Sequence, residues 1–172
     1  SQNKQRMFFR IACQYYWGVL ASQMHTKVVG WGSTPIPLNI YAINFAVSGF
    51  GKGFSTGLIE SEVINKFRAN FMDNTFHLQA ETNINELAKH KALHKGTDIT
   101  EETERLIKEF NAAGALMFSF DDATMAAVKQ MRHKLIIAGS GAVNLQVDEV
   151  GAKLVNQEDV LAGFLELYDT GK

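Results

Sequence analysis

The strongest constraint on the fold is a glycine-rich segment, residues 48–56, which reads SGFGKGFST. It follows a nearly unbroken run of β-favouring side chains at residues 40–47, which predicts a strand covered on both faces, as in a parallel sheet. Beyond Lys52 the apolar side chains recur at every fourth position, which predicts a helix of about four or five turns. These positions are Ile59, Val63, Phe67 and Phe71. We therefore expect a strand, a glycine turn and a helix in succession.

The glycine turn has the chemistry of a phosphate-binding site. Glycines allow backbone N–H groups to turn toward an anion, and a helix start adds unsatisfied amides and a partial positive charge. Lys52 is expected to contact terminal phosphate oxygens as a compact cation. The segment thus resembles a Walker-type phosphate-binding loop; a turn needed only for backbone geometry is the alternative. The residues expected to bind a nucleotide are Ser48, Gly49, Phe50, Gly51, Lys52, Gly53, Phe54 and Ser55.

Two positions depart from the Walker pattern. Ala46 stands where the pattern begins with glycine, and Gly53 stands where Ser or Thr follows the lysine. The hydroxyl at that second position normally binds Mg²⁺, so this ligand has to come from a later residue of the helix. Ser55 and Thr56 are the candidates, and we favour Ser55 as the metal ligand.

A pair of acidic residues complements the glycine turn. Residues 142–147 alternate in polarity, which predicts a second strand ending at Asp148 and Glu149. Ligands of open α/β sheets bind beyond the carboxyl ends of strands, where Asp148 is expected to hold Mg²⁺ through water and Glu149 to polarise the attacking water. Alone, two such acids indicate a solvated turn. Together with the glycine turn they predict ATP hydrolysis, with Lys52 and Glu149 as catalytic residues.

Helical periodicity covers much of the remaining chain. The expected helices are residues 7–24, 101–113 with Thr100 as its cap, 125–137 with a cap among residues 121–124, and 158–168. Gly30, Gly32, Pro35 and Pro37 predict a connector. Strands separated by helices predict an α/β fold with a mainly parallel sheet. We expect a single domain over residues 1–172, with an N-terminal helix and connector at 1–36 and a nucleotide-binding core at 37–172.

The charge balance excludes a molecule that is drawn to polyanions by its overall field. The 172 residues include 17 Lys and Arg against 18 Asp and Glu, a formal net charge of −1. Any contact with DNA must therefore come from a local patch. The only basic cluster is typical of a solvated helix face, although it could touch a nucleic-acid backbone. It consists of Lys89, His90, Lys91, His94 and Lys95.

Cysteine use and hydropathy indicate the expected compartment. Cys13 is the only cysteine, and the histidines have no carboxylate or cysteine nearby at the spacing of a metal site, so we assign them no role. The most apolar N-terminal stretch is interrupted by Arg10 and Gln14 and is shorter than the roughly 20 residues of a membrane span. We expect a cytoplasmic protein with no membrane partner.

Four sequence blocks together resemble the ATPase core of phage and prophage primase-helicase-like proteins. They are residues 37–41 leading into the glycine turn, 122–124, 148–149 and 165–169, and the resemblance spans residues 37–172. It implies a P-loop ATPase of RecA-like or related fold that uses Mg²⁺ and ATP and forms a homo-oligomeric ring on single-stranded or duplex DNA. For a phage protein, the compartment is the cytoplasm of the bacterial host.

Such a motor also needs a polar sensor residue and a basic finger that neutralise charge on the terminal phosphate. Only 23 residues follow Glu149, so we expect a fragment with partial competence. A small nucleotide kinase is one alternative, but the arginines show no arrangement that would clamp two nucleotides. A non-catalytic assembly module is the other, since the hydroxyl after Lys52 is missing. The arginines are Arg6, Arg10, Arg68, Arg105 and Arg132.

Overall fold

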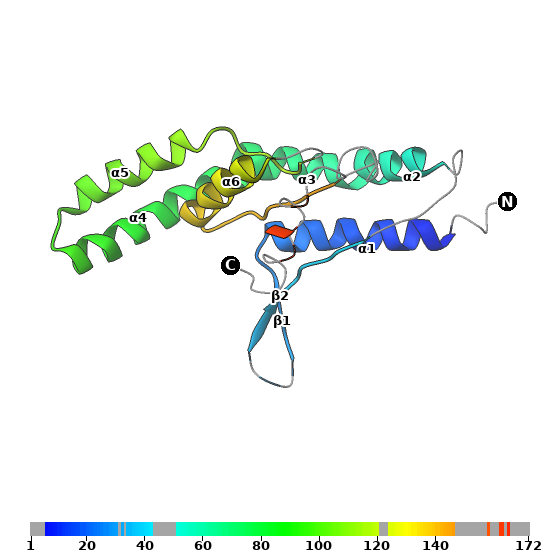
Figure 1. Cartoon of the computed structure of the whole chain (residues 1–172), viewed down its shortest axis with the longest axis horizontal. Coiled ribbons are helices and arrows are strands. Elements are labelled where there is room, and N and C mark those ends of the chain that lie inside the picture. The colour runs from blue at the N-terminus through cyan, green and yellow to red at the C-terminus, as the bar shows by residue number, and fades with distance from the viewer. Residues whose placement is uncertain are drawn as a thin grey trace. The chain divides into compact units, whose positions relative to one another are not determined.

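The computed structural model divides the chain into two compact units, Ser1–Phe71 (unit 1) and Met72–Lys172 (unit 2) (Figure 1). The residues that the structure describes are 6–30, 32, 34–42, 51–120, 124–146, 158, 162, 163 and 165. None of the helices in these ranges is both long enough and apolar enough to cross a membrane.

The predicted α/β fold, a P-loop NTPase core with a mainly parallel sheet, is wrong. Of the residues that the structure describes, 71% are helical, and the sheet found among them has two antiparallel strands. Residues 40–42, which begin the first predicted strand, form neither helix nor strand, and residues 43–47 lie outside the described ranges. The second predicted strand, residues 142–147, contributes one isolated bridge at Leu145. The error arises because a short apolar run has no periodicity that distinguishes a strand from other buried backbone.

The two strands of unit 1 lie where a connector was expected. β1 (Lys27–Val29) pairs antiparallel with β2 (Pro35–Pro37), so that Val28 faces Ile36 in the register. All the residues of both strands are exposed. Proline removes a backbone donor and is confined to strand edges, which limits this pairing to a short hairpin.

The first predicted helix of unit 1 is confirmed as α1 (Arg6–Gln23). Its buried face carries Phe8, Ala12, Tyr16 and Val19, the spacing of a helix with one face packed inward. The Tyr16 hydroxyl donates a hydrogen bond to Glu60 Oε1 at 2.7 Å. Burial, followed by the negative charge of Glu60, raises the pKa of the neighbouring Tyr15 to about 12.

The helical run after the glycine turn is also present, with a change in its buried face. It comprises α2 (Lys52–Ile59), the π-helical turn η2 (Glu60–Ile64) and α3 (Asn65–Asn70). Sequence periodicity placed Val63 in the core after Ile59, but Ile64 is buried and Val63 is exposed. A π-helical turn accommodates one extra residue, and the buried position therefore moves from the fourth residue to the fifth.

Among the described residues of unit 2, three long helices each pack against the other two (Figure 1). The π-helical turn η3 (Phe71–Thr75) precedes α4 (Phe76–Lys95), which is followed by α5 (Ile99–Ala112) and α6 (Met125–Ala138). The buried stripe of α4 recurs at every fourth residue, and its small alanines allow neighbouring helices to approach closely. This stripe is Phe76, Ala80, Ile84, Ala88 and Ala92.

Helix ends in unit 2 are fixed by specific caps. Asp98 caps α5, accepting hydrogen bonds from the N–H groups of Thr100 at 2.7 Å and Glu101 at 3.3 Å. The prediction of Thr100 as the cap is therefore wrong, because the cap lies two residues earlier, at Asp98. The predicted cap among residues 121–124 is confirmed at Thr124, which accepts from the Ala127 N–H at 3.2 Å. Both oxygen caps satisfy amides that lack an intrahelical partner.

A buried lysine connects α6 to α5. Lys134 Nζ donates to the Phe110 carbonyl at 2.9 Å and lies 3.8 Å from the centre of the Phe110 ring. Burial lowers the pKa of Lys134. A cation near the C-terminal turn of α5 also complements the helix dipole. Lys134 therefore holds these two helices together.

The corner between α4 and α5, residues 96–102, is held by the carboxylate of Glu102. Gly96 ends α4 in the left-handed conformation, with φ of 69°. Glu102 is buried and accepts from Lys95 at 3.0 Å and from Arg105 at 2.6 Å. The hydrogen bond from Arg105, and then that from Lys95, lower the pKa of Glu102 to about 2.

Glu102→Gln is expected to destabilise unit 2 at neutral pH, because a neutral amide cannot form these ion pairs. Because the pKa of Glu102 is lowered in the folded state, its ionised carboxylate stabilises the protein at pH values above the ordinary carboxylate pKa of 4.5. This stabilisation disappears as the pH falls toward 2. Urea unfolding at several pH values should show the difference from wild type shrinking over that range. Glu104→Gln, an exposed change in α5, is the control. A difference that does not depend on pH would contradict the role of the charge.

Candidate nucleotide site

The predicted start of a helix at the glycine turn is confirmed. Gly51 has φ of 87° and ψ of 23°, a left-handed conformation that glycine adopts without steric strain. α2 begins at the next residue, Lys52, and its first hydrogen bond runs from the Ser55 N–H to the Gly51 carbonyl at 3.1 Å. The amides of residues 52–54 precede this bond, so they belong to the set that a helix leaves without intrahelical partners.

The side chains of this first turn differ in their accessibility. Phe54 is 74% exposed and Lys52 is half-buried. Ser55 is only 1% exposed, and its hydroxyl donates to the Gly51 carbonyl at 3.1 Å. The half-buried Thr56 likewise donates to the Lys52 carbonyl at 3.1 Å. A donating hydroxyl keeps lone pairs for a metal, but the burial of Ser55 leaves little room for Mg²⁺ and its waters.

Five of the predicted site residues lie outside the described ranges, so no distance joins them to Lys52. The structure therefore brings together only residues 51–55 of the predicted site. The remaining residues are Ser48, Gly49, Phe50, Asp148 and Glu149.

In unit 2, the segment that leads toward the acidic pair has a neighbour that sequence reasoning missed. Phe120 and Leu145 form a parallel bridge. The Phe120 N–H donates to the Asn144 carbonyl at 2.8 Å, and the Gln146 N–H donates to the Phe120 carbonyl at 2.7 Å. Asn144 Nδ2 also donates to the Phe118 carbonyl at 3.1 Å. In the sequence, Asp121 follows Phe120 directly and Asp148 follows Val147 directly. The signal that could have indicated this pairing is that both segments end in an acidic residue.

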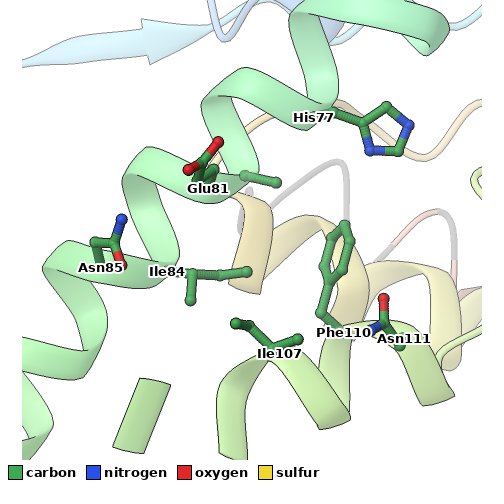
Figure 2. A pocket seen from close by; sticks show the side chains of 8 residues that line it. His77, Glu81, Ile84, Asn85, Ile107, Phe110 and Asn111 are labelled. Carbon is green, nitrogen blue, oxygen red and sulfur yellow. The ribbon is translucent and has the colours of Figure 1, made fainter. Parts of the chain in front are cut away.

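A pocket of about 290 Å³, which was not predicted from the sequence, lies between α4 and α5 (Figure 2). Its apolar part includes the buried side chains of Ile84 and Phe110, and the exposed Glu81 and Asn85 lie along its α4 edge. An apolar wall with amide and carboxylate groups at its edge suits a small flat ligand that carries hydrogen-bond donors. The lining residues are His77, Ala80, Glu81, Ile84, Asn85, Ile107, Phe110 and Asn111.

The basic cluster on α4 is partly neutralised by ion pairs. Lys89 contacts Glu86 at 2.8 Å, and Lys95 contacts Glu102 at 3.0 Å. These contacts weaken the attraction that the cluster would exert on a nucleic-acid backbone. Within the ranges that the structure describes, no group of three or more His, Cys, Asp or Glu side chains could hold a metal ion.

Comparison with known proteins adds no relative. No protein-family model matches the chain, and neither the curated proteins nor the solved structures contain a match.

Proposed function

We propose that this chain binds ATP at the glycine turn and belongs to the ATP-hydrolysing part of a phage-type replicative helicase or related DNA-dependent ATPase. The observation that carries the proposal is the start of α2 at Lys52, directly after the left-handed Gly51. Helix N-terminal amides and a lysine ammonium at one point are the groups that recognise a polyphosphate. The proposal rests on this local geometry and on the order of the sequence motifs.

The parallel bridge between Phe120 and Leu145 supports the acidic half of the proposal. In a parallel bridge the two segments run in the same direction, so both chains leave the bridge at the same end. In the sequence these residues include Asp121 after the first segment and the pair Asp148 and Glu149 after the second. Asp148 is proposed to hold Mg²⁺ through water.

Lys52→Ala is expected to weaken ATP binding by about 10- to 100-fold, since it removes a charge-assisted contact to phosphate worth roughly 1.5–3 kcal/mol. Thermal unfolding of the full chain, titrated with ATP and Mg²⁺, measures the affinity. Lys66→Ala, an exposed change in α3, is the matched control and should leave the affinity unchanged. Equal ATP affinity in Lys52→Ala and wild type would overturn the phosphate-binding role.

A non-catalytic assembly module is the second candidate, and the burial of Ser55 favours it, because a buried hydroxyl is a poor replacement for the missing Mg²⁺ ligand. Phosphate release from ATP, measured with and without single-stranded DNA, distinguishes the two. An ATPase releases phosphate without an acceptor, whereas an assembly module binds ATP and releases none. A requirement for a nucleoside monophosphate would instead indicate a kinase.

A further inference from the structure

Two histidines on the surface of α4 lie side by side. His90 and His94 are four residues apart, so both project from the same face of the helix. Their ring centres are 4.5 Å apart, with 52° between the ring planes. Both residues are exposed to solvent. The proposed nucleotide site makes no use of this pair.

The separation of the two rings is close to that of a metal chelate. Two imidazole nitrogens that bind one tetrahedral zinc ion at about 2.0–2.1 Å place their ring centres about 5 Å apart. The observed 4.5 Å is close to this distance, and rotation of the side chains can direct one nitrogen of each ring toward the metal. Exposed side chains undergo such rotations readily, on a picosecond to nanosecond timescale.

The positive charges around the pair are partly offset by carboxylates, although Lys91 lies between the two histidines in the sequence. Lys89 is paired with Glu86 at 2.8 Å, and Lys95 is paired with Glu102 at 3.0 Å. Both carboxylates offset lysine charge on this part of α4, which reduces the repulsion that a dication would meet.

We propose that His90 and His94 form a two-ligand site for a divalent transition-metal ion such as Zn²⁺, whose other coordination positions are taken by water. Imidazole nitrogen is a preferred ligand of Zn²⁺, Cu²⁺ and Ni²⁺, whereas Mg²⁺ and Ca²⁺ prefer oxygen. The site is thus distinct in its metal chemistry from the Mg²⁺ of the proposed ATPase reaction. Binding at residues four apart also crosslinks one turn of α4 and should stabilise it.

Calorimetric titration of the full chain with Zn²⁺, without a polyhistidine tag, tests the proposal. His90→Ala and His94→Ala should each weaken Zn²⁺ binding by at least about tenfold, because the second imidazole of a chelate binds at a high effective concentration. His77→Ala, a change elsewhere on α4, is the matched control and should leave the affinity unchanged. His90 and His94 are both exposed, and alanine favours helix, so the two variants should retain the fold.

Paramagnetic Ni²⁺ locates the site directly. Amide NMR signals of α4 residues around His90 and His94 should broaden at low Ni²⁺ concentration, and the double substitution to alanine should remove this effect. Unchanged Zn²⁺ affinity in the double variant, or a loss that follows His133→Ala instead, would overturn the proposal. Lys52→Ala should retain Zn²⁺ binding, which separates this test from that of the ATP site.

Discussion

Glu149→Gln is expected to bind ATP as tightly as wild type and to lose ATP hydrolysis, with a fall in rate of about 100- to 10,000-fold. The reason is chemical, because a glutamine amide has nearly the same shape as the carboxylate but cannot accept a proton from the attacking water. Phosphate release under saturating ATP and Mg²⁺ measures the rate, and ligand-dependent thermal unfolding measures binding.

Glu158→Gln, an exposed change in the sequence after the acidic pair, is the control and should leave both quantities unchanged. Asp148→Asn should instead weaken the Mg²⁺ dependence of hydrolysis, since Asp148 is assigned to the metal. Normal hydrolysis in Glu149→Gln would remove Glu149 from its role as general base. A wild-type chain that binds ATP without releasing phosphate would favour the assembly module.

Phe76→Ala is expected to lower the free energy of unfolding of unit 2 by about 3–5 kcal/mol. Phe76 is fully buried at the start of α4, and its ring stacks on Phe110 with 6.0 Å between ring centres. Truncation removes these contacts and leaves a cavity at the point where α4 meets α5. The loss should extend to the contact of Phe110 with Lys134, whose Nζ lies on the same ring.

Leu78→Ala is the matched control for this experiment, because Leu78 is in the same helix and is 65% exposed. Its expected effect is within about 0.5 kcal/mol, as is usual for a surface substitution. Chemical denaturation monitored by circular dichroism measures both variants. A change of less than about 1 kcal/mol for Phe76→Ala would show that Phe76 contributes little to the core.

Helices with strong periodicity could be predicted from the sequence. Apolar residues recur through α1, and Thr124 before α6 is a residue type whose short oxygen-bearing side chain caps helices. α4 was not among the expected helices, because much of its buried stripe is alanine. Ala80, Ala88 and Ala92 carry little hydropathy signal, and exposed polar residues separate them. A helix that packs through small residues is therefore not detected from hydropathy alone.

The sheet could not be predicted, because strand pairing depends on partners that are remote in sequence. Residues 40–42 belong to a run with strong β propensity but form no strand, because propensity decides little without a partner strand. β2 forms instead at Pro35–Pro37, since its partner β1 is only a few residues away. The parallel bridge between Phe120 and Leu145 involves segments too short to carry a periodic signal.

For residues 51–55 of the candidate site, the helix start was predicted and the burial of Ser55 was not. The helix start at Lys52 and the need for glycine at position 51 followed from local residue types, which act through the backbone. The burial of Ser55 depends on neighbours that no spacing rule identifies. For the same reason the pocket between α4 and α5 became visible only when the two helices were packed.

The corner at residues 96–102 also has a consequence for how unit 2 folds. Lys95 and Glu102, which contact each other at 3.0 Å, are seven residues apart in the sequence. Ring closure over so few residues loses little chain entropy, so this hairpin can form before any remote contact is made. Because Lys95 and Glu102 are close in the sequence, the α4–α5 pair is suited to act as the folding nucleus against which α6 packs later.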